Sequence, residues 1–112
     1  MAFQRGDIVL VPFPFSDQST AKVRPAVVVS STLCNANEPD IVLAAITSQL
    51  ASATGPLDYV LSDWQSSGLR FASAFKPVFT TLDPSLVLFT VGSLSNLDMV
   101  GVDQRLRFAF AL

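Results

Sequence analysis

The stretch Arg24–Ser30 reads RPAVVVS, and it decides the fold class. Its three consecutive valines favour a strand, and an unbroken apolar run of this length is typical of a strand buried on both faces. Pro25 disfavours a helical conformation at the preceding residue and so keeps Arg24 extended. The sequence therefore predicts that Arg24 stands at the mouth of an interior strand.

Similar short runs occur on both sides of this strand. β-Branched and aromatic residues predict strands over 7–13, 26–30, 41–47, 56–61, 73–81 and 86–91. Polar or turn-forming loops are expected at 16–23, 32–40, 49–55 and 64–68. The first of these loops is longer than a tight hairpin needs. Six short strands favour a mainly β fold, a small curled barrel.

The C-terminal segment has a different period. Ser95 and Asp98 resemble a capping box, with Asp in place of the usual Glu or Gln. Apolar residues then follow at helical spacing, namely Met99, Val102, Leu106 and Phe110. We therefore expect one amphipathic helix over 95–111 that closes the domain.

Length and composition limit the class of protein. The chain has 112 residues, which predicts a single domain over 1–112. Half of the residues are hydrophobic and 14% are charged, so either the surface is unusually apolar or a partner covers part of it. No apolar run has the length of a membrane span, and the first residues have no apolar signal core. Together with the lone Cys34, this predicts a cytoplasmic protein.

Charge and histidine content limit the chemistry. The formal net charge of −2 argues against nucleic-acid binding, whose affinity comes largely from positive charge. A local basic cleft is still compatible with the basic residues Arg5, Lys22, Arg24, Arg70 and Lys76. Histidine is absent, which removes the usual general base and the commonest zinc ligand. No cofactor or metal is expected, and catalysis would depend on Arg, Lys, carboxylates and hydroxyls.

Arg24 has two interpretations. A cation at the mouth of an apolar strand is costly unless it has a partner or a function. Composition alone favours a structural ion pair, with Asp17 or Asp83, over a functional role by about two to one. Thr47 and Ser48 also have two interpretations. Their adjacent hydroxyls can bind a phosphate, or they can simply end a strand.

Taken together, these pieces resemble the PemK/MazF family of toxin ribonucleases. The resemblance runs from about Arg5 to the C-terminus, and the motifs agree in order and spacing. The matching pieces are Gly6-Asp7-Ile8-Val9, Arg24-Pro25, Thr47-Ser48, Gly68-Leu69, Ser73, Thr81-Leu82-Asp83 and Gly92-Ser93-Leu94.

The resemblance implies a fold and a function. The fold would be an SH3-like β-barrel with a C-terminal α-helix, assembled as a homodimer. The activity would be that of a type II toxin, a growth-inhibiting endoribonuclease that cleaves single-stranded messenger RNA in a sequence-specific way without a metal. Its partners would be RNA, a cognate antitoxin and, only as the toxin–antitoxin complex, operator DNA; a membrane is not among them.

The resemblance also assigns residues. Arg24 corresponds to the catalytic arginine and Thr47 to its hydroxyl partner, and the loop 16–23 to a mobile loop over the RNA groove. The RNA-binding candidates are Ser16, Asp17, Gln18, Lys22, Ser48, Ser73 and Lys76. Some members carry an Arg and an Asp before the Thr81-Leu82-Asp83 motif, where this chain has Lys76-Pro77; Lys76 supplies the charge, and Pro77 supplies no acid. Arg24 and Asp17 are the two candidates for the general base.

Two other functions remain open. The first is a barrel that binds a protein target without cleaving RNA, like the related toxins that poison DNA gyrase through their C-terminal helix. This chain ends Phe108-Ala-Phe-Ala-Leu112, without the Trp-Gly-Ile ending of that group. The second is a degenerate member that only binds RNA or its antitoxin. Incubation with RNA in EDTA separates these alternatives from a nuclease.

Overall fold

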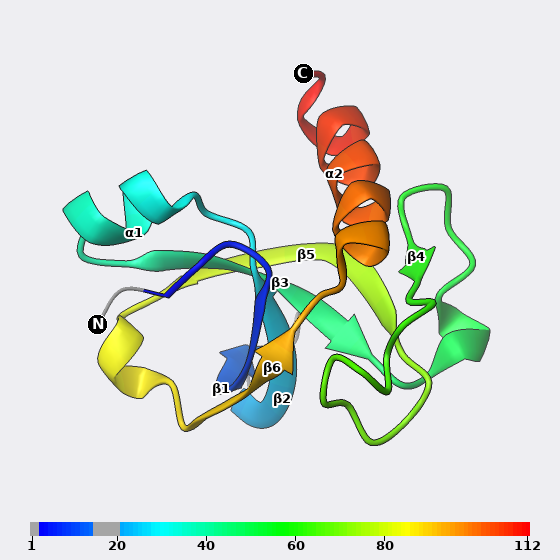
Figure 1. The fold of residues 1–112 in the computed structure, drawn as a ribbon, viewed down its shortest axis with the longest axis horizontal. Helices are drawn as coiled ribbons and strands as arrows, with labels where there is room; N and C mark the ends of the chain where they lie inside the picture. The colour runs from blue at the N-terminus through cyan, green and yellow to red at the C-terminus, as the bar shows by residue number, and fades with distance from the viewer. Residues whose placement is uncertain (1–2, 15–20) are drawn as a thin grey trace.

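The computed structural model describes residues 3–14 and 21–112, and it confirms a mainly β fold with a C-terminal helix (Figure 1). The strands form one curled antiparallel sheet in the order β4-β5-β3-β2-β1-β6, a half-barrel whose two edges are β4 and β6. The elements are β1 (Asp7–Pro14), β2 (Ala21–Val28), α1 (Thr32–Asn37), β3 (Ile41–Thr47), η1 (Leu50–Ser52), β4 (Tyr59–Val60), β5 (Ala74–Leu82), η2 (Pro84–Leu86), β6 (Phe89–Ser93) and α2 (Asn96–Phe110).

The sheet separates two apolar clusters, because side chains alternate between the faces of a strand. The first face carries the cluster Val9, Val11, Phe13, Ala26, Val28, Ile41 and Leu43, all buried. The second face carries Val27, Ala44, Ile46 and Phe75, and it packs against Leu61 and against Val102 and Leu106 of α2. Burial on both sides explains the continuous apolar run of β2, which the sequence predicted correctly.

Strand β5 contains an irregularity that accommodates its proline. Ala44 pairs with Phe79, whereas the next residue of β3, Ala45, pairs with Lys76. Pro77 and Val78 are therefore the extra residues of a bulge, which is where a strand tolerates a residue without an N–H.

Four local predictions were wrong. The strand expected over 86–91 is displaced to Phe89–Ser93, because Pro84–Leu86 forms a 3-10 turn capped by Asp83. Residues 32–40 were expected to form a loop, but Thr32–Asn37 is a helical turn whose first amides are capped by the Ser31 hydroxyl, 3.0 Å from the Cys34 nitrogen. The strand expected over 56–61 shrinks to Tyr59–Val60. The loop expected over 16–23 is shorter, because β2 already begins at Ala21; its residues 16–20 lie outside the described part of the chain.

Helix α2 begins and ends close to its predicted bounds, and its C-terminal end projects away from the sheet in Figure 1. Ser95 caps it by accepting from the Asp98 amide. Asp98 does not return the bond as a capping box requires, because its buried carboxylate binds the segment after β4 instead. Phe110 also departs from the prediction, since its side chain is exposed while its ring lies 5.1 Å from the Phe79 ring. Within the described ranges, no helix is long and apolar enough to cross a membrane.

Candidate nucleic-acid interface

Arg24 and Thr47 belong to neighbouring strands and share the first face of the sheet. Val11 pairs with Arg24 across β1 and β2, and Ala26 pairs with Ala45 across β2 and β3. Extending the second register by two residues on each strand sets Arg24 opposite Thr47. Directly opposed residues of an antiparallel pair project on the same side, so the two predicted catalytic residues lie on one face.

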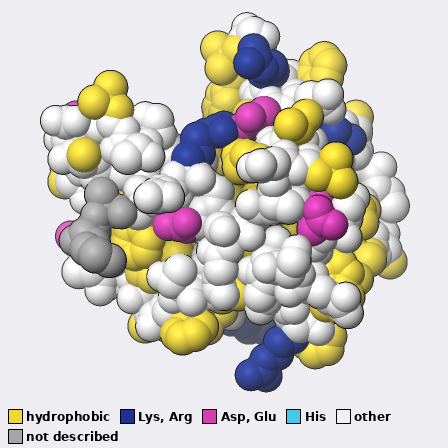
Figure 2. All heavy atoms as spheres, viewed as in Figure 1, with side chains coloured by type: hydrophobic (Ala, Val, Ile, Leu, Met, Phe, Trp, Pro, Cys, Tyr) yellow, Lys and Arg dark blue, Asp and Glu magenta, His cyan; other side chains and the backbone are white. Residues whose placement is uncertain are grey.

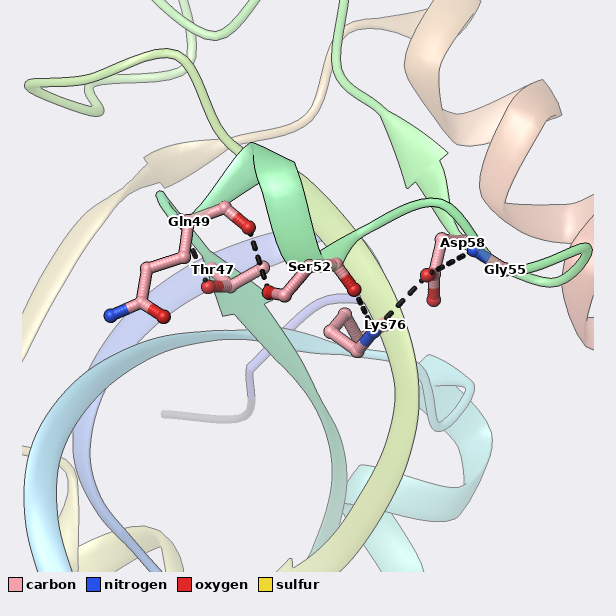
Figure 3. A network of polar contacts seen from close by, with 6 residues as sticks. All are labelled: Thr47, Gln49, Ser52, Gly55, Asp58 and Lys76. Atoms are coloured by element: carbon pink, nitrogen blue, oxygen red, sulfur yellow. Dashed lines mark hydrogen bonds and ion pairs between the residues drawn. The ribbon is translucent and has the colours of Figure 1, made fainter.

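Thr47 ends β3 with part of its hydrogen-bonding capacity in use. Its hydroxyl oxygen accepts from the Gln49 amide at 3.1 Å, and its side chain is half-buried (Figure 3). A hydroxyl that accepts one bond still carries its own proton, which it can donate to an oxygen. This turn geometry is what ordinary strand ends show, and it leaves the hydroxyl able to bind a phosphate as well.

Lys76 shares this face but is engaged in an internal network. Directly opposite Ala45, it extends from β5 toward the turn after β3 (Figure 3). Its Nζ donates to the Asp58 carboxylate at 3.0 Å and to the Ser52 carbonyl at 3.1 Å. Asp58, whose side chain is only 6% exposed, also accepts from the Gly55 amide. The ammonium that was expected in the RNA groove thus ties the segment after β3 to the sheet.

A separate hollow lies on the second face, and we refer to it as the apolar cleft. Its volume is about 470 Å³, which is within the range of small-ligand pockets. Its floor is a row across four strands, since Phe89 pairs with Leu10 and Leu10 with Pro25, beside Ile46. The full set of lining residues is Leu10, Arg24, Pro25, Ile46, Ser48, Gly68, Leu69, Arg70, Phe71, Ser73, Phe89 and Val91.

One wall of the cleft is the segment before β5. Gly68 in this segment and Gly92 on β6 allow the two backbones to lie in direct contact. Gly68 has a φ of +91°, which glycine adopts without strain, and a Cβ there would lie 2.4 Å from the Val91 carbonyl oxygen. Ser67 beside it is fully buried, and its hydroxyl donates to the Asp63 carbonyl at 3.0 Å. The backbone at 67–68 therefore touches β6 directly, which fixes where the following residues, including Arg70 and Phe71, emerge.

The remaining predicted RNA-binding residues are divided. Ser48 and Ser73 both line the apolar cleft; Ser48 is exposed, whereas Ser73 is buried and its hydroxyl donates to the Phe71 carbonyl at 2.8 Å. Lys22 is exposed on β2, opposite Phe13 and hence on the first face. Ser16, Asp17 and Gln18 lie outside the described residues.

Asp83, one candidate partner for Arg24, has a local role. Its carboxylate accepts from the Ser85 amide at 2.9 Å and caps η2. The hydrogen bonds from Ser85 lower the pKa of Asp83 below its ordinary value. Basic side chains do not gather on the face drawn in Figure 2, where hydrophobic side chains are prominent along α2.

Sequence reasoning missed three residues of the apolar cleft as site candidates, namely Arg70, Phe71 and Phe89. Arg70 was counted only as a basic residue, and the two phenylalanines only as apolar ones. Phe71 and Phe89 are 66% and 63% exposed. Phe71 follows a turn and Phe89 lies in a largely apolar stretch, and neither pattern distinguishes an exposed phenylalanine from a buried one.

The described residues contain no cluster of three or more His, Cys, Asp or Glu side chains that could hold a metal ion. Metal independence stays a prediction, since it concerns the reaction itself.

Comparison with solved structures supports the fold. A Mycobacterium tuberculosis toxin, MazF-mt6, superimposes with a TM-score of 0.75 at 16% identity, over 95% of this chain and 97% of that one. MazF from Deinococcus radiodurans gives 0.77 at 18% identity, over 100% and 99% of the two chains. A mycobacterial endoribonuclease in complex with its cognate antitoxin gives 0.77 at 18% identity, over 99% and 95%.

Comparison by sequence identifies the family. No curated relative matches the chain. The sequence model described as PemK-like, MazF-like toxin of type II toxin-antitoxin system, however, matches residues 4–110, nearly the whole chain. The predicted resemblance is thereby confirmed, and the chain belongs to the PemK-like, MazF-like toxins of type II toxin–antitoxin systems.

Proposed function

We propose that this toxin is an endoribonuclease that cleaves single-stranded RNA without a metal, and that Arg24 and Thr47 are its catalytic residues. The observation that carries the proposal is their placement. An arginine and a threonine, which the family resemblance assigns to catalysis, project from neighbouring strands onto one face of the sheet. Similar structures from mycobacteria are described as endoribonucleases, which agrees with this activity.

RNA supplies the nucleophile for this reaction. The 2′-oxygen attacks the adjacent phosphorus, a new O–P bond forms, and the bond from phosphorus to the 5′-oxygen breaks. The 2′-hydroxyl loses a proton and the leaving 5′-oxygen gains one, so the products are a 2′,3′-cyclic phosphate and a 5′-hydroxyl. The enzyme has to align the attacking oxygen with the leaving oxygen and stabilise the negative charge that develops on the phosphate.

Arg24 is suited to the second task. Its guanidinium is planar and always charged, and it can donate two parallel hydrogen bonds to phosphate oxygens. Thr47 is suited to the first task, because its hydroxyl can donate to the phosphate or to the 2′-oxygen while its own oxygen accepts from the Gln49 amide. The chain offers no histidine for proton transfer. Arg24 and Asp17 remain the candidates for the general base.

We further propose that the toxin is a homodimer and binds a cognate antitoxin. Exposed apolar side chains support a covered surface: Leu86, Leu88 and Phe89 lie in and before β6, and Leu97, Val100, Phe108 and Phe110 lie on α2. An acidic segment that folds on the basic residues Lys22 and Arg24 would block RNA. Light scattering tests the dimer at micromolar concentration, and a monomer mass would contradict it.

The decisive experiment is cleavage of RNA in EDTA. Purified toxin is incubated with a mixed-sequence single-stranded RNA, and the fragment ends are mapped. We expect fragments with 5′-hydroxyl ends from the wild type and very few from Arg24→Ala. Intact RNA in EDTA together with cleavage on addition of Mg²⁺ would refute the metal-independent mechanism. RNA that stays intact under both conditions would favour a barrel that only binds its target.

A further inference from the structure

A chain of hydrogen bonds joins Lys76 on β5 to the Thr47 hydroxyl through the turn after β3 (Figure 3). The Lys76 ammonium donates to the Ser52 carbonyl at 3.1 Å, and the Ser52 hydroxyl donates to the Gln49 carbonyl at 2.8 Å. The Gln49 amide in turn donates to the Thr47 hydroxyl oxygen at 3.1 Å. We refer to these four residues as the Thr47 network. The catalytic proposal uses only its last member.

Hydrogen bonds, rather than packing, hold the turn in place. Gln49 and Ser52 are both exposed, so few apolar contacts restrain them. Ser52 binds the Gln49 carbonyl twice, because its amide also donates there at 3.1 Å. Lys76 is itself fixed by Asp58, a carboxylate only 6% exposed and 3.0 Å away. The position of the Gln49 amide therefore depends on the bonds that Ser52 and Lys76 make.

The Gln49 amide determines how the Thr47 hydroxyl is oriented. A threonine hydroxyl has one proton and two lone pairs, and its χ1 angle has few allowed values. Because the amide N–H occupies one lone pair, the hydroxyl proton points away from Gln49 and is available to another acceptor. Such alignment has a large effect on rate, since displacing a reacting group by about 1 Å can slow a reaction about 100-fold.

We propose that Lys76, Ser52 and Gln49 are positioning residues, which hold the Thr47 hydroxyl in the orientation that binds the phosphate or the 2′-oxygen. The inference rests on the proposed nuclease function and extends it to residues that do not touch RNA. Ser52 acts through its hydroxyl, Gln49 through its backbone, and Lys76 through an ammonium that uses two of its three N–H donors within the protein.

Single-turnover cleavage tests the role of Ser52. Toxin in excess cuts a mixed-sequence RNA in EDTA, which gives the limiting rate and the toxin concentration at half-maximal rate. Ser52→Ala should lower the limiting rate about 10-fold and leave that concentration unchanged, because alignment is lost while contacts to RNA remain. Ser52→Thr keeps the hydroxyl and should restore most of the rate.

The matched control is Ser66→Ala. The exposed Ser66 hydroxyl also donates to the carbonyl of the residue three positions earlier, Asp63, at 3.1 Å, but it belongs to a different loop. This variant should cut RNA at the wild-type rate. A Ser52→Ala protein that cuts as fast as Ser66→Ala would overturn the proposal.

A double-mutant cycle shows whether Ser52 acts through Thr47. Once Thr47→Val has removed the hydroxyl, nothing is left to orient, so adding Ser52→Ala should not slow cleavage further. All rates are measured well below the melting temperature of each variant. A further loss of about 10-fold in the Thr47→Val background would mean that the two effects are independent, and it would overturn the positioning role.

Salt dependence separates positioning by Lys76 from contact with RNA. The probe is a fluorescein-labelled, mixed-sequence 2′-O-methyl RNA, which lacks the nucleophile, and its affinity is measured by fluorescence anisotropy. A phosphate contact on a single strand contributes about 0.7 to the slope of log affinity against log salt concentration. Lys76→Met should lower the limiting rate and leave this slope unchanged. A slope reduced by that amount would assign Lys76 to RNA binding and remove it from the Thr47 network.

Hydrogen exchange tests the Thr47 network without any cleavage. We expect the Gln49 amide to exchange about 5- to 10-fold faster in Ser52→Ala than in the wild type, in keeping with the weakening of one hydrogen bond. Equal exchange in the two proteins would refute the link between Ser52 and Gln49. A wild type that leaves RNA intact refutes the nuclease itself. A wild type that cuts RNA, with Ser52→Ala equally fast, refutes the positioning role alone.

Discussion

Gly92 on β6 faces the Ser67 carbonyl so closely that a Cβ atom at residue 92 would lie 2.2 Å from the carbonyl oxygen. The obstacle is backbone of a fully buried residue, so it cannot rotate away. We expect Gly92→Ala to lower the free energy of unfolding by about 1–3 kcal/mol, the usual cost of overpacking. Urea denaturation measures it, with Ser93→Ala at the neighbouring exposed position as the control. Equal stability of the two variants would contradict the conclusion that the backbones of Gly92 and Ser67 lie in direct contact.

Replacing Arg24 tests catalysis. Arg24→Ala should slow RNA cleavage by about 10²- to 10³-fold, the usual effect of removing one preorganised donor to a developing oxyanion. Arg24→Lys should recover little of the rate, because an ammonium cannot make the paired contact of a guanidinium. The melting temperature and the cleavage rate are measured on the same sample. An Arg24→Ala protein that melts earlier but cuts at the wild-type rate would assign Arg24 to an ion pair.

Thr47→Val separates the hydroxyl from the shape of the side chain. Valine keeps the volume and the β-branch, so the strand end should stay intact, but the hydroxyl that accepts from the Gln49 amide is lost. We expect the cleavage rate to fall much more than the melting temperature. Thr81→Val is the control, since Thr81 lies exposed on β5. Equal rates for the two variants would remove Thr47 from the mechanism.

The Lys76–Asp58 pair should behave as a structural unit. Lys76→Met leaves the Asp58 carboxylate, 6% exposed, without its cation, and we expect a loss of about 1–3 kcal/mol in the free energy of unfolding. Asp58→Asn should cost a similar amount, and the double variant less than the sum. Arg107→Met, which removes one positive charge at an exposed position of α2, is the charge-matched control. Strict additivity in the double-mutant cycle would show that the pair contributes no coupling.

Tyr59 makes stability sensitive to alkaline pH. Burial, and then the hydrogen bond that its hydroxyl donates to Asp98 at 2.8 Å, raise the pKa of Tyr59 above its ordinary value of 10.0. A raised folded-state pKa gives stability that is fully present below the unfolded value and is lost as the pH rises through the folded value.

The wild type should therefore lose stability above about pH 10 more steeply than Tyr59→Phe. The variant keeps the ring, which packs against Gly101 and lies 5.0 Å from the Arg105 guanidinium. Chemical denaturation over a pH series measures the difference, and parallel pH profiles would contradict the assignment.

The strands that carry the site were predictable because their signals are local. Arg24-Pro25 followed by consecutive valines predicts an extended interior strand, and the observed β2 contains this run as far as Val28. The bounds of β3 agree with the prediction at both ends, since Thr47 is followed by a turn. The Ser95 cap was predictable for the same reason, because a cap involves neighbours along the chain.

The cleft was not predictable, because it depends on contacts between distant segments. Its floor joins Phe89, Leu10 and Pro25 through strand pairings that only the complete topology defines. Asp98 illustrates the same limit: its position predicted a capping box, yet its carboxylate accepts from the amides of Ser62 and Asp63 instead. Lys76 was expected to face RNA, and only the fold reveals Asp58 beside it.

The pairing of β1 with β6 has a consequence for synthesis of the toxin. Asp7 pairs with Ser93, and the Gly6 carbonyl accepts from the Leu94 amide at 2.9 Å, so β1 pairs with the strand of this sheet that is synthesised after all the others. Contacts between such distant segments form slowly, because a long loop must be closed first. In a nascent chain on the ribosome, one edge of β1 therefore has no strand partner until β6 has emerged. A truncated translation product that stops before β6 would expose that edge to proteases and to aggregation.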